Sequence, residues 1–256
     1  MSVILLTSAC GAPGVTTTTL GLAVTWPRAA VAVEADPAGG SSMLAGYFRG
    51  FQAPTQSIVD LLLAHRDGRL ADQFPQSLIP VESTSASVLP GPRSHAQARS
   101  ALELWEPLSL TWKALQSADT DVLVDAGRLG MESYPESLLR VSDLVLLLTR
   151  SDLPSLAATR QWAERAAQTR QLHPETPEWA VLIVGGGHPY TAREVGDVLG
   201  LPVLYELRLD AKGASTYSLG APGRPTHFNN DLARCGEKVR ERLGAAGLLL
   251  EPKGTP

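Results

Sequence analysis

The chain has 256 residues, of which 44% are hydrophobic and 19% charged, so it has enough apolar material for a full core and does not have the composition of a disordered chain. Its 22 basic and 26 acidic residues give a net charge of −4, which argues against a general attraction for nucleic acid. Two cysteines are too few for a disulfide scaffold, and the apolar N-terminus carries no basic leader, so we expect a cytoplasmic protein without a signal peptide.

Short apolar runs typical of buried strands alternate along the chain with stretches of helical spacing. The predicted strands are residues 3–7, 30–34, 78–81, 88–89, 121–125, 143–149, 179–184 and 203–207. The predicted helices are residues 16–24, 57–64, 96–116, 156–167, 192–199 and 232–243, and the third is either one helix or two joined near Pro107. This alternation predicts an α/β fold with a single, mostly parallel sheet and helices on both faces. We expect one domain over residues 1–246 and a C-terminal tail over residues 247–256.

The loop between the first predicted strand and helix is the first candidate site, and it reads Ala9-Cys10-Gly11-Ala12-Pro13-Gly14-Val15-Thr16-Thr17. Backbone N–H groups at such a turn attract phosphate. Thr16 would offer its hydroxyl to a nucleotide-bound magnesium ion, and Thr17 could bond an α-phosphate. The loop fails the usual G-x-x-x-x-G-K-[ST] pattern, because Ala9 stands for the first glycine and Val15 for the lysine. A tight turn without a ligand explains this loop equally well.

Two further loops place a carboxylate at the end of a predicted strand. Asp36 follows the second strand, and Asp125 ends a strand with a fully apolar centre. Ligands of open α/β sheets bind beyond the carboxyl ends of the strands, so both acids are expected beside the first loop. A carboxylate at a strand end is also common without any metal. The occurrence of three suitable loops in this order favours a nucleotide site.

The three loops together resemble the MinD/ParA branch of P-loop ATPases, whose deviant Walker A motif reads K-G-G-V-G-K-T-T. The residues that match are Gly11, Gly14, Thr16 and Thr17. Cys10 stands where the family has the signature lysine that reaches across the dimer to the partner's ATP, and Val15 stands where it has the phosphate-loop lysine. The atypical sequence is most similar to the CpaE/TadZ-like subgroup, some members of which carry degraded ATP sites.

The resemblance implies roles for further residues. Asp36, in a segment like the family's D-x-D-P, would help to position the attacking water, and Asp125 would handle Mg²⁺ or its water. The ligand set carried over in this way comprises Gly11, Ala12, Pro13, Gly14, Val15, Thr16 and Thr17 around the phosphates, with Thr16, Asp36 and Asp125 around the metal. Arg208 and Asp210 would lie near the base, while Val184 and Gly185 replace the Asn-Arg pair that often grips adenine. Arg128, Arg208 and Lys212 are candidates for a replacement cation.

The resemblance leaves three functions open. The first is a degenerate positioning scaffold that acts through a protein partner, which can be membrane-associated and can recruit it to the membrane, with weak or no ATP hydrolysis. The second is a slow but active ATPase in partitioning or localisation that binds ATP and Mg²⁺ through the backbone, Thr16 and Thr17, in either case as a possible homodimer. The third is a DNA-binding partition protein, which the net charge disfavours. The densest basic cluster, Arg234, Lys238, Arg240 and Arg242, is interleaved with Glu237 and Glu241 and is better explained as a solvated helix face.

Overall fold

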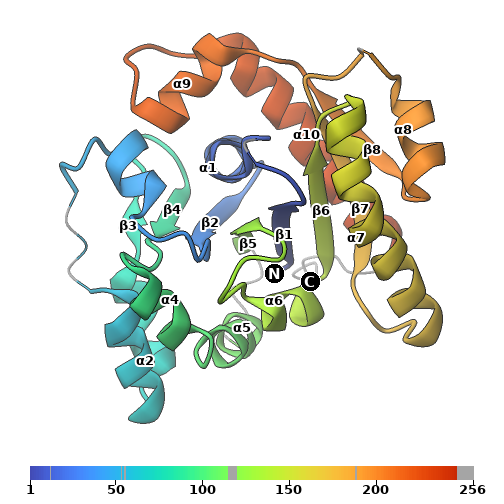
Figure 1. The fold of residues 1–256 in the computed structure, drawn as a ribbon. Coiled ribbons are helices and arrows are strands. Elements are labelled where there is room, and N and C mark those ends of the chain that lie inside the picture. The colour runs from blue at the N-terminus through green and yellow to red at the C-terminus, as the bar shows by residue number, and fades with distance from the viewer. Residues whose placement is uncertain (12, 53, 55, 115–119, 188, 247–256) are drawn as a thin grey trace, which may run out of the picture.

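The computed structural model describes residues 1–11, 13–52, 54, 56–114, 120–187 and 189–246. Within them the chain forms an eight-stranded sheet in the order β3-β4-β2-β5-β1-β6-β7-β8 (Figure 1). Every strand pair is parallel except β3–β4, which is antiparallel. The strands are β1 (Val3–Ser8), β2 (Ala29–Glu34), β3 (Ile79–Pro80), β4 (Ala86–Leu89), β5 (Thr120–Arg128), β6 (Leu144–Thr149), β7 (Glu178–Val184) and β8 (Val203–Leu207). The predicted fold class is confirmed.

Helices cover both faces of this sheet because successive strand side chains point in opposite directions. In β1, Ile4 and Leu6 pack on one face and Val3 and Leu5 on the other. The first face is covered by α1 (Val15–Thr25), α9 (Ala211–Leu219) and α10 (Thr226–Ala245). The second carries α2 (Ile58–Arg66), α3 (Leu70–Gln73), α4 (His95–Ala101), α5 (Trp105–Ala114), α6 (Glu136–Val141), α7 (Leu153–Leu172) and α8 (Ala192–Leu199). Two short helical segments, Met43–Tyr47 and Pro75–Ser77, complete the described elements.

The long helix expected over residues 96–116 is two helices. α4 ends at Ala101 and α5 begins at Trp105, so the break precedes Pro107. Pro107 lies in the first turn of α5, where its missing N–H has no intrahelical partner to lose. Residues 115 and 116 of the predicted helix lie outside the described part of the chain, as does the predicted tail over residues 247–256.

A buried ion pair fixes the amino ends of the central strands. Asp121, at the start of β5, is fully buried and accepts hydrogen bonds from the Ser2 amide at 2.8 Å and the Trp26 indole at 2.9 Å. The Arg28 guanidinium donates to the same carboxylate at 2.7 Å. Burial raises the pKa of Asp121, but the bonds from Arg28 and Trp26 outweigh burial and hold it below its usual value. The pair therefore joins β1, the end of α1 and the start of β2.

Within the described residues, no helix combines the length and the apolar composition that a membrane span requires.

Candidate phosphate-binding site

The loop after β1 turns sharply into α1. Gly14 takes the left-handed conformation with φ of 88°, and α1 begins at the next residue, Val15. A glycine adopts this conformation without a Cβ penalty, which explains its use here. Gly14 has no side chain that could cap the helix, so the first N–H groups of α1 are left without an intrahelical or capping partner. This is the backbone arrangement that binds phosphate when a ligand is present.

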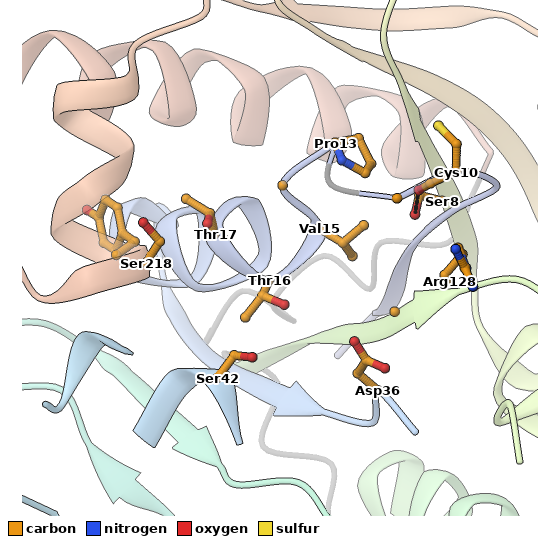
Figure 2. A pocket seen from close by; sticks show the side chains of 14 residues that line it. Ser8, Cys10, Pro13, Val15, Thr16, Thr17, Asp36, Ser42, Arg128 and Ser218 are labelled. Carbon is orange, nitrogen blue, oxygen red and sulfur yellow. Dashed lines mark hydrogen bonds between the residues drawn. The ribbon is translucent and has the colours of Figure 1, made fainter. Parts of the chain in front are cut away.

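A cavity of about 330 Å³ lies against this loop (Figure 2). Four parts of the chain line it: the loop and the start of α1, the segment after β2, the end of β5, and the end of α9. It brings together most of the predicted phosphate and metal ligands, namely Gly11, Pro13, Gly14, Val15, Thr16, Thr17 and Asp36. Ala12, which was predicted as a ligand, lies outside the described residues.

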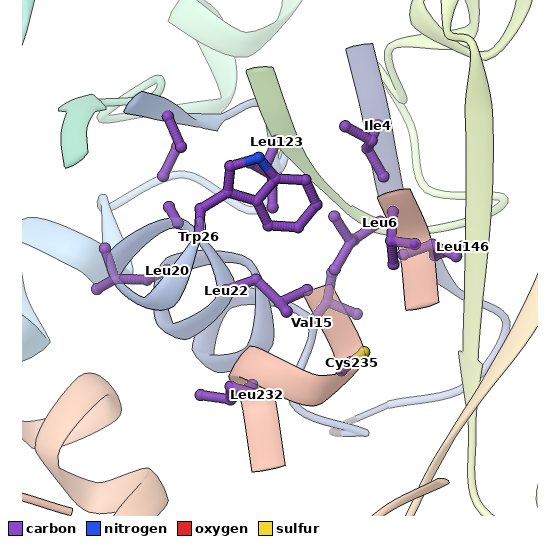
Figure 3. Packing of buried hydrophobic residues seen from close by; sticks show 14 of the residues in the cluster. Ile4, Leu6, Val15, Leu20, Leu22, Trp26, Leu123, Leu146, Leu232 and Cys235 are labelled. Atoms are coloured by element: carbon purple, nitrogen blue, oxygen red, sulfur yellow. The ribbon is translucent and has the colours of Figure 1, made fainter. Parts of the chain in front are cut away.

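Val15 is both a wall of the cavity and part of the hydrophobic core. Its side chain is 7% exposed and belongs to the core cluster that includes Leu6, Leu146 and Cys235 (Figure 3). Apolar packing therefore occupies the position at which the P-loop pattern has a lysine. The cavity wall at this point carries no charge and donates no side-chain hydrogen bond.

Asp125 is a fully buried carboxylate near the end of β5. Its Oδ1 accepts a hydrogen bond from the Gly127 amide at 2.9 Å, while its Oδ2 has no hydrogen-bond partner of standard geometry. Burial raises its pKa to about 7, the Asp36 and Glu34 charges add to the rise, and the facing Thr16 hydroxyl lowers it. A buried oxygen without a partner beside a threonine hydroxyl suits a hard cation such as Mg²⁺ or its bound water.

The described residues contain no group of three or more His, Cys, Asp or Glu side chains arranged to hold a metal ion. A Mg²⁺ ion bound by Thr16 and Asp125 would therefore need oxygens of phosphate or water to complete its coordination. The residues present fit a metal that arrives with a nucleotide, and they do not form a metal cage of their own.

Asp36 lies beside Asp125 at the same edge of the sheet, as expected. The Ala35 amide donates to the Asp125 carbonyl at 2.7 Å, and the Asp36 Oδ1 accepts from the Ala38 amide at 2.8 Å. Gly127 has φ of 66°, and a Cβ there would overlap the Asp36 carboxylate. A glycine is therefore required at this contact between the loops after β2 and β5.

Glu34 is a structural residue of the site, and no role for it was predicted from the sequence. The side chain is buried, and its Oε2 accepts from the Ser41 hydroxyl at 2.5 Å and the Gly91 amide at 3.2 Å. Its Oε1 accepts from the Met43 amide at 3.2 Å. Burial raises the pKa of Glu34, and these bonds partly offset the rise. Glu34 therefore fixes the loop that presents Asp36 and Ser42 to the cavity.

Tyr217 and Ser218 form a wall that the sequence did not predict, because α9 has the composition AKGASTYSL and shows no clear apolar period. Arg208 and Asp210, predicted near a base, line two other cavities. Asp210 accepts from the Gly213 amide at 2.7 Å and caps α9, and its cavity measures about 390 Å³. Arg208 lines one of about 340 Å³, and its backbone amide donates to Asp231 at 2.9 Å. A base-binding role for these two residues stays a prediction.

Two of the four residues of the basic cluster on α10 pair with acids. Lys238 bonds Glu241 at 2.7 Å, and Arg242 pairs with Glu178 of β7. Paired charges of this kind leave little positive field for a nucleic-acid backbone, in agreement with the solvated helix face that the sequence suggested.

No protein-family model matches the sequence, and no curated protein matches it. Solved structures do resemble the fold. The cell division ATPase MinD of Pyrococcus furiosus has a TM-score of 0.71 at 18% identity, covering 94% of this chain and 99% of its own. The septum site-determining protein MinD of Pyrococcus horikoshii in complex with Mg-ADP has a TM-score of 0.69 at 17% identity, covering 98% and 99%. The MinC:MinD cell division complex of Aquifex aeolicus gives 0.72 at 15% identity, covering 100% of both chains. The TM-scores establish a likeness of fold, and at identities this low the likeness extends to the fold alone.

Proposed function

We propose that this chain is a degenerate MinD/ParA-like positioning protein, related to the CpaE/TadZ-like subgroup, which acts in the cytoplasm through protein partners. It binds Mg²⁺–ATP weakly and hydrolyses it at a negligible rate. The observation that carries the proposal is the combination of a preserved phosphate loop and cavity with a buried Val15 in place of the lysine. The arrangement of the loop, the cavity and the two acids supports a phosphate site, while both lysines that would hold the phosphates are missing.

In this proposal the backbone amides at the start of α1 hold the phosphates. Thr16 and Asp125 hold the Mg²⁺, which would offset phosphate charge when bound. The missing lysines each remove a charge-assisted contact of about 1.5–3 kcal/mol. At ~1.4 kcal/mol per decade, the loss amounts to roughly two to four decades of affinity. The structural likeness to MinD in a complex with MinC supports a protein partner, which could also recruit the chain to a membrane.

The alternative is a slow ATPase of the same fold, and the position of Asp36 favours it. Asp36 lines the cavity and lies against Gly127, where the resemblance gives an acid the task of positioning the attacking water. The two candidates share a binding site and differ only in turnover.

A titration with Mg²⁺–ATP tests the shared site. Adding both lysines in the variant Cys10→Lys/Val15→Lys should raise affinity about 100-fold or more, because Val15→Lys returns a charge-assisted contact within the chain and Cys10→Lys returns one to the ATP of a partner copy where a dimer forms. Val15 lines the cavity while its side chain packs into the core, so a lysine there would have to bury its stem to extend its ammonium into the cavity. Thermal melting of the variant shows whether it is folded. Leu110→Lys, at an exposed position of α5, adds the same type of charge elsewhere and should change nothing. If neither the wild type nor the double variant binds Mg²⁺–ATP, the cavity is not a nucleotide site.

A further inference from the structure

The end of β5 places one arginine at the rim of the cavity. Arg128 pairs with Ser8 across β1 and β5, and the following amide, that of Leu129, donates to the Ser8 carbonyl at 2.8 Å. Both strands are central in the sheet, so the backbone at Arg128 is held firmly beside the phosphate loop (Figure 2). Strand β1, which leads into the phosphate loop, therefore also fixes the position of Arg128 through its pairing with β5.

The guanidinium of Arg128 is exposed and weakly engaged. Its Nη2 donates to the Met131 sulfur at 3.0 Å, and a thioether is a weak acceptor without charge. No ion pair joins Arg128 to any other residue that the structure describes. Turning the side chain from Met131 toward a ligand would therefore give up little.

Arg128 is also the one cationic side chain among the described residues that line the cavity, and Asp36 is the one acid. Cys10 and Val15, at the two lysine positions, line the same cavity without charge. A guanidinium presents a planar fork that can bond two phosphate oxygens at once, which a lysine does not do.

We propose that Arg128 contacts the phosphate chain of the ligand and supplies the positive charge that Cys10 and Val15 cannot. This inference rests on the proposed nucleotide site and adds to it a specific recognition residue from a different strand. A fork of this kind can bond two oxygens of one phosphate group or of two adjacent ones, so binding of phosphate-bearing ligands should depend on Arg128.

The test is a binding titration with a fluorescent ATP analogue and Mg²⁺, with inorganic tripolyphosphate as competitor. Arg128→Ala should lose about 10- to 100-fold in affinity for both probes. Arg128→Lys should recover only part of that loss, because it restores the charge without the fork. Arg193→Ala, at an exposed arginine of α8, is the matched control and should bind like the wild type. Thermal melting of each variant reports whether it is folded.

The outcomes distinguish the role of Arg128 from the existence of the nucleotide site. Equal binding by the wild type and folded Arg128→Ala would overturn the role of Arg128 and leave the nucleotide site standing. Full recovery by Arg128→Lys would contradict recognition by a fork. Absence of binding by the wild type to either probe would overturn both this inference and the proposed function.

Discussion

Asp125 is a carboxyl group that folding places in an unfavourable environment. It is fully buried, has an oxygen without a hydrogen-bond partner of standard geometry, and lies near the carboxylates of Asp36 and Glu34. The groups that face it and lower its pKa are the Thr16 hydroxyl and the Gly127 amide. Buried carboxylates with strongly raised pKa values are concentrated at functional sites. A cation bound beside Asp125 would stabilise its charged form.

This environment gives a pH dependence of stability with a definite sign. The pKa of Asp125 rises from 3.8 in the unfolded chain to about 7 in the fold, so between these values the folded state holds a proton that the unfolded state releases. The contribution of Asp125 to stability should therefore fall as the pH rises from about 4 to 7 and then level off. Asp125→Asn removes the ionisation and should be more stable than the wild type at pH 8, on the order of a few kcal/mol at ~1.4 kcal/mol per pKa unit.

Urea denaturation of the ligand-free protein and Asp125→Asn at several pH values checks this expectation. The difference between the two proteins should be small near pH 4 and should grow toward pH 7. A difference that does not change with pH would mean that Asp125 ionises in the fold as easily as it does in the unfolded chain.

The residues of the site were predictable where a local motif fixes them. Gly14, Thr16 and Asp36 lie as the loop motifs indicated, because a strand-to-helix turn determines their position. The packing of Val15 into the core was not predictable from the loop, because it depends on Leu146 and Cys235, more than 100 residues away. The anchoring by Glu34 likewise depends on the distant Gly91 amide.

At the scale of elements, apolar runs identified the strands well and the helices less completely. β8 and α8 have the predicted bounds, because turn residues and a capping box mark their ends. α7 begins at Leu153, three residues before the predicted start, since the Asp152 side chain caps it and Pro154 is tolerated in its first turn. α9 was missed, and it is the element that brings Tyr217 and Ser218 to the cavity.

α9 is held in place by aromatic contacts that no local pattern reveals. Tyr217 stacks on Tyr47 with ring centroids 6.0 Å apart and planes at 11°, and it packs against Phe228 of α10. A Cβ at Gly46 would collide with the Ser218 carbonyl, so the helical segment Met43–Tyr47 approaches α9 closely. The cavity wall thus comes from tertiary packing between segments about 170 residues apart.

At the scale of the whole molecule, the parallel sheet with helices on both faces follows from the alternation of strands and helices. The order of its strands places β2, β5 and β1 side by side, so the three predicted loops meet at one edge. The antiparallel pair β3–β4 at one end of the sheet did not follow from this alternation. The two predicted strands there were short, and a turn rather than a helix separated them.

Self-association, if it occurs, should not depend on ATP. Cys10 lines the cavity with a short and neutral side chain, so it cannot make the charged contact with a partner's phosphates that the family resemblance assigns to its lysine. ATP can shift the equilibrium between monomer and dimer only if it binds one of them more tightly than the other, and without the charged contact that difference in affinity should be small. Sedimentation velocity with and without ATP and Mg²⁺ should give the same distribution. A monomer that dimerises only with nucleotide would refute this, and Arg128→Ala would then show whether the arginine makes the contact.

The central claim, a nucleotide site that is kept for binding and has lost its catalytic charge, is tested most directly by steady-state ATP turnover. The measurement uses the purified wild type with Mg²⁺ alongside Asp36→Ala, at ATP concentrations that the titration shows to be saturating. The account predicts phosphate release from the wild type at the background level of Asp36→Ala. Turnover that persists in the wild type and vanishes in Asp36→Ala would contradict it and would establish the chain as a working ATPase.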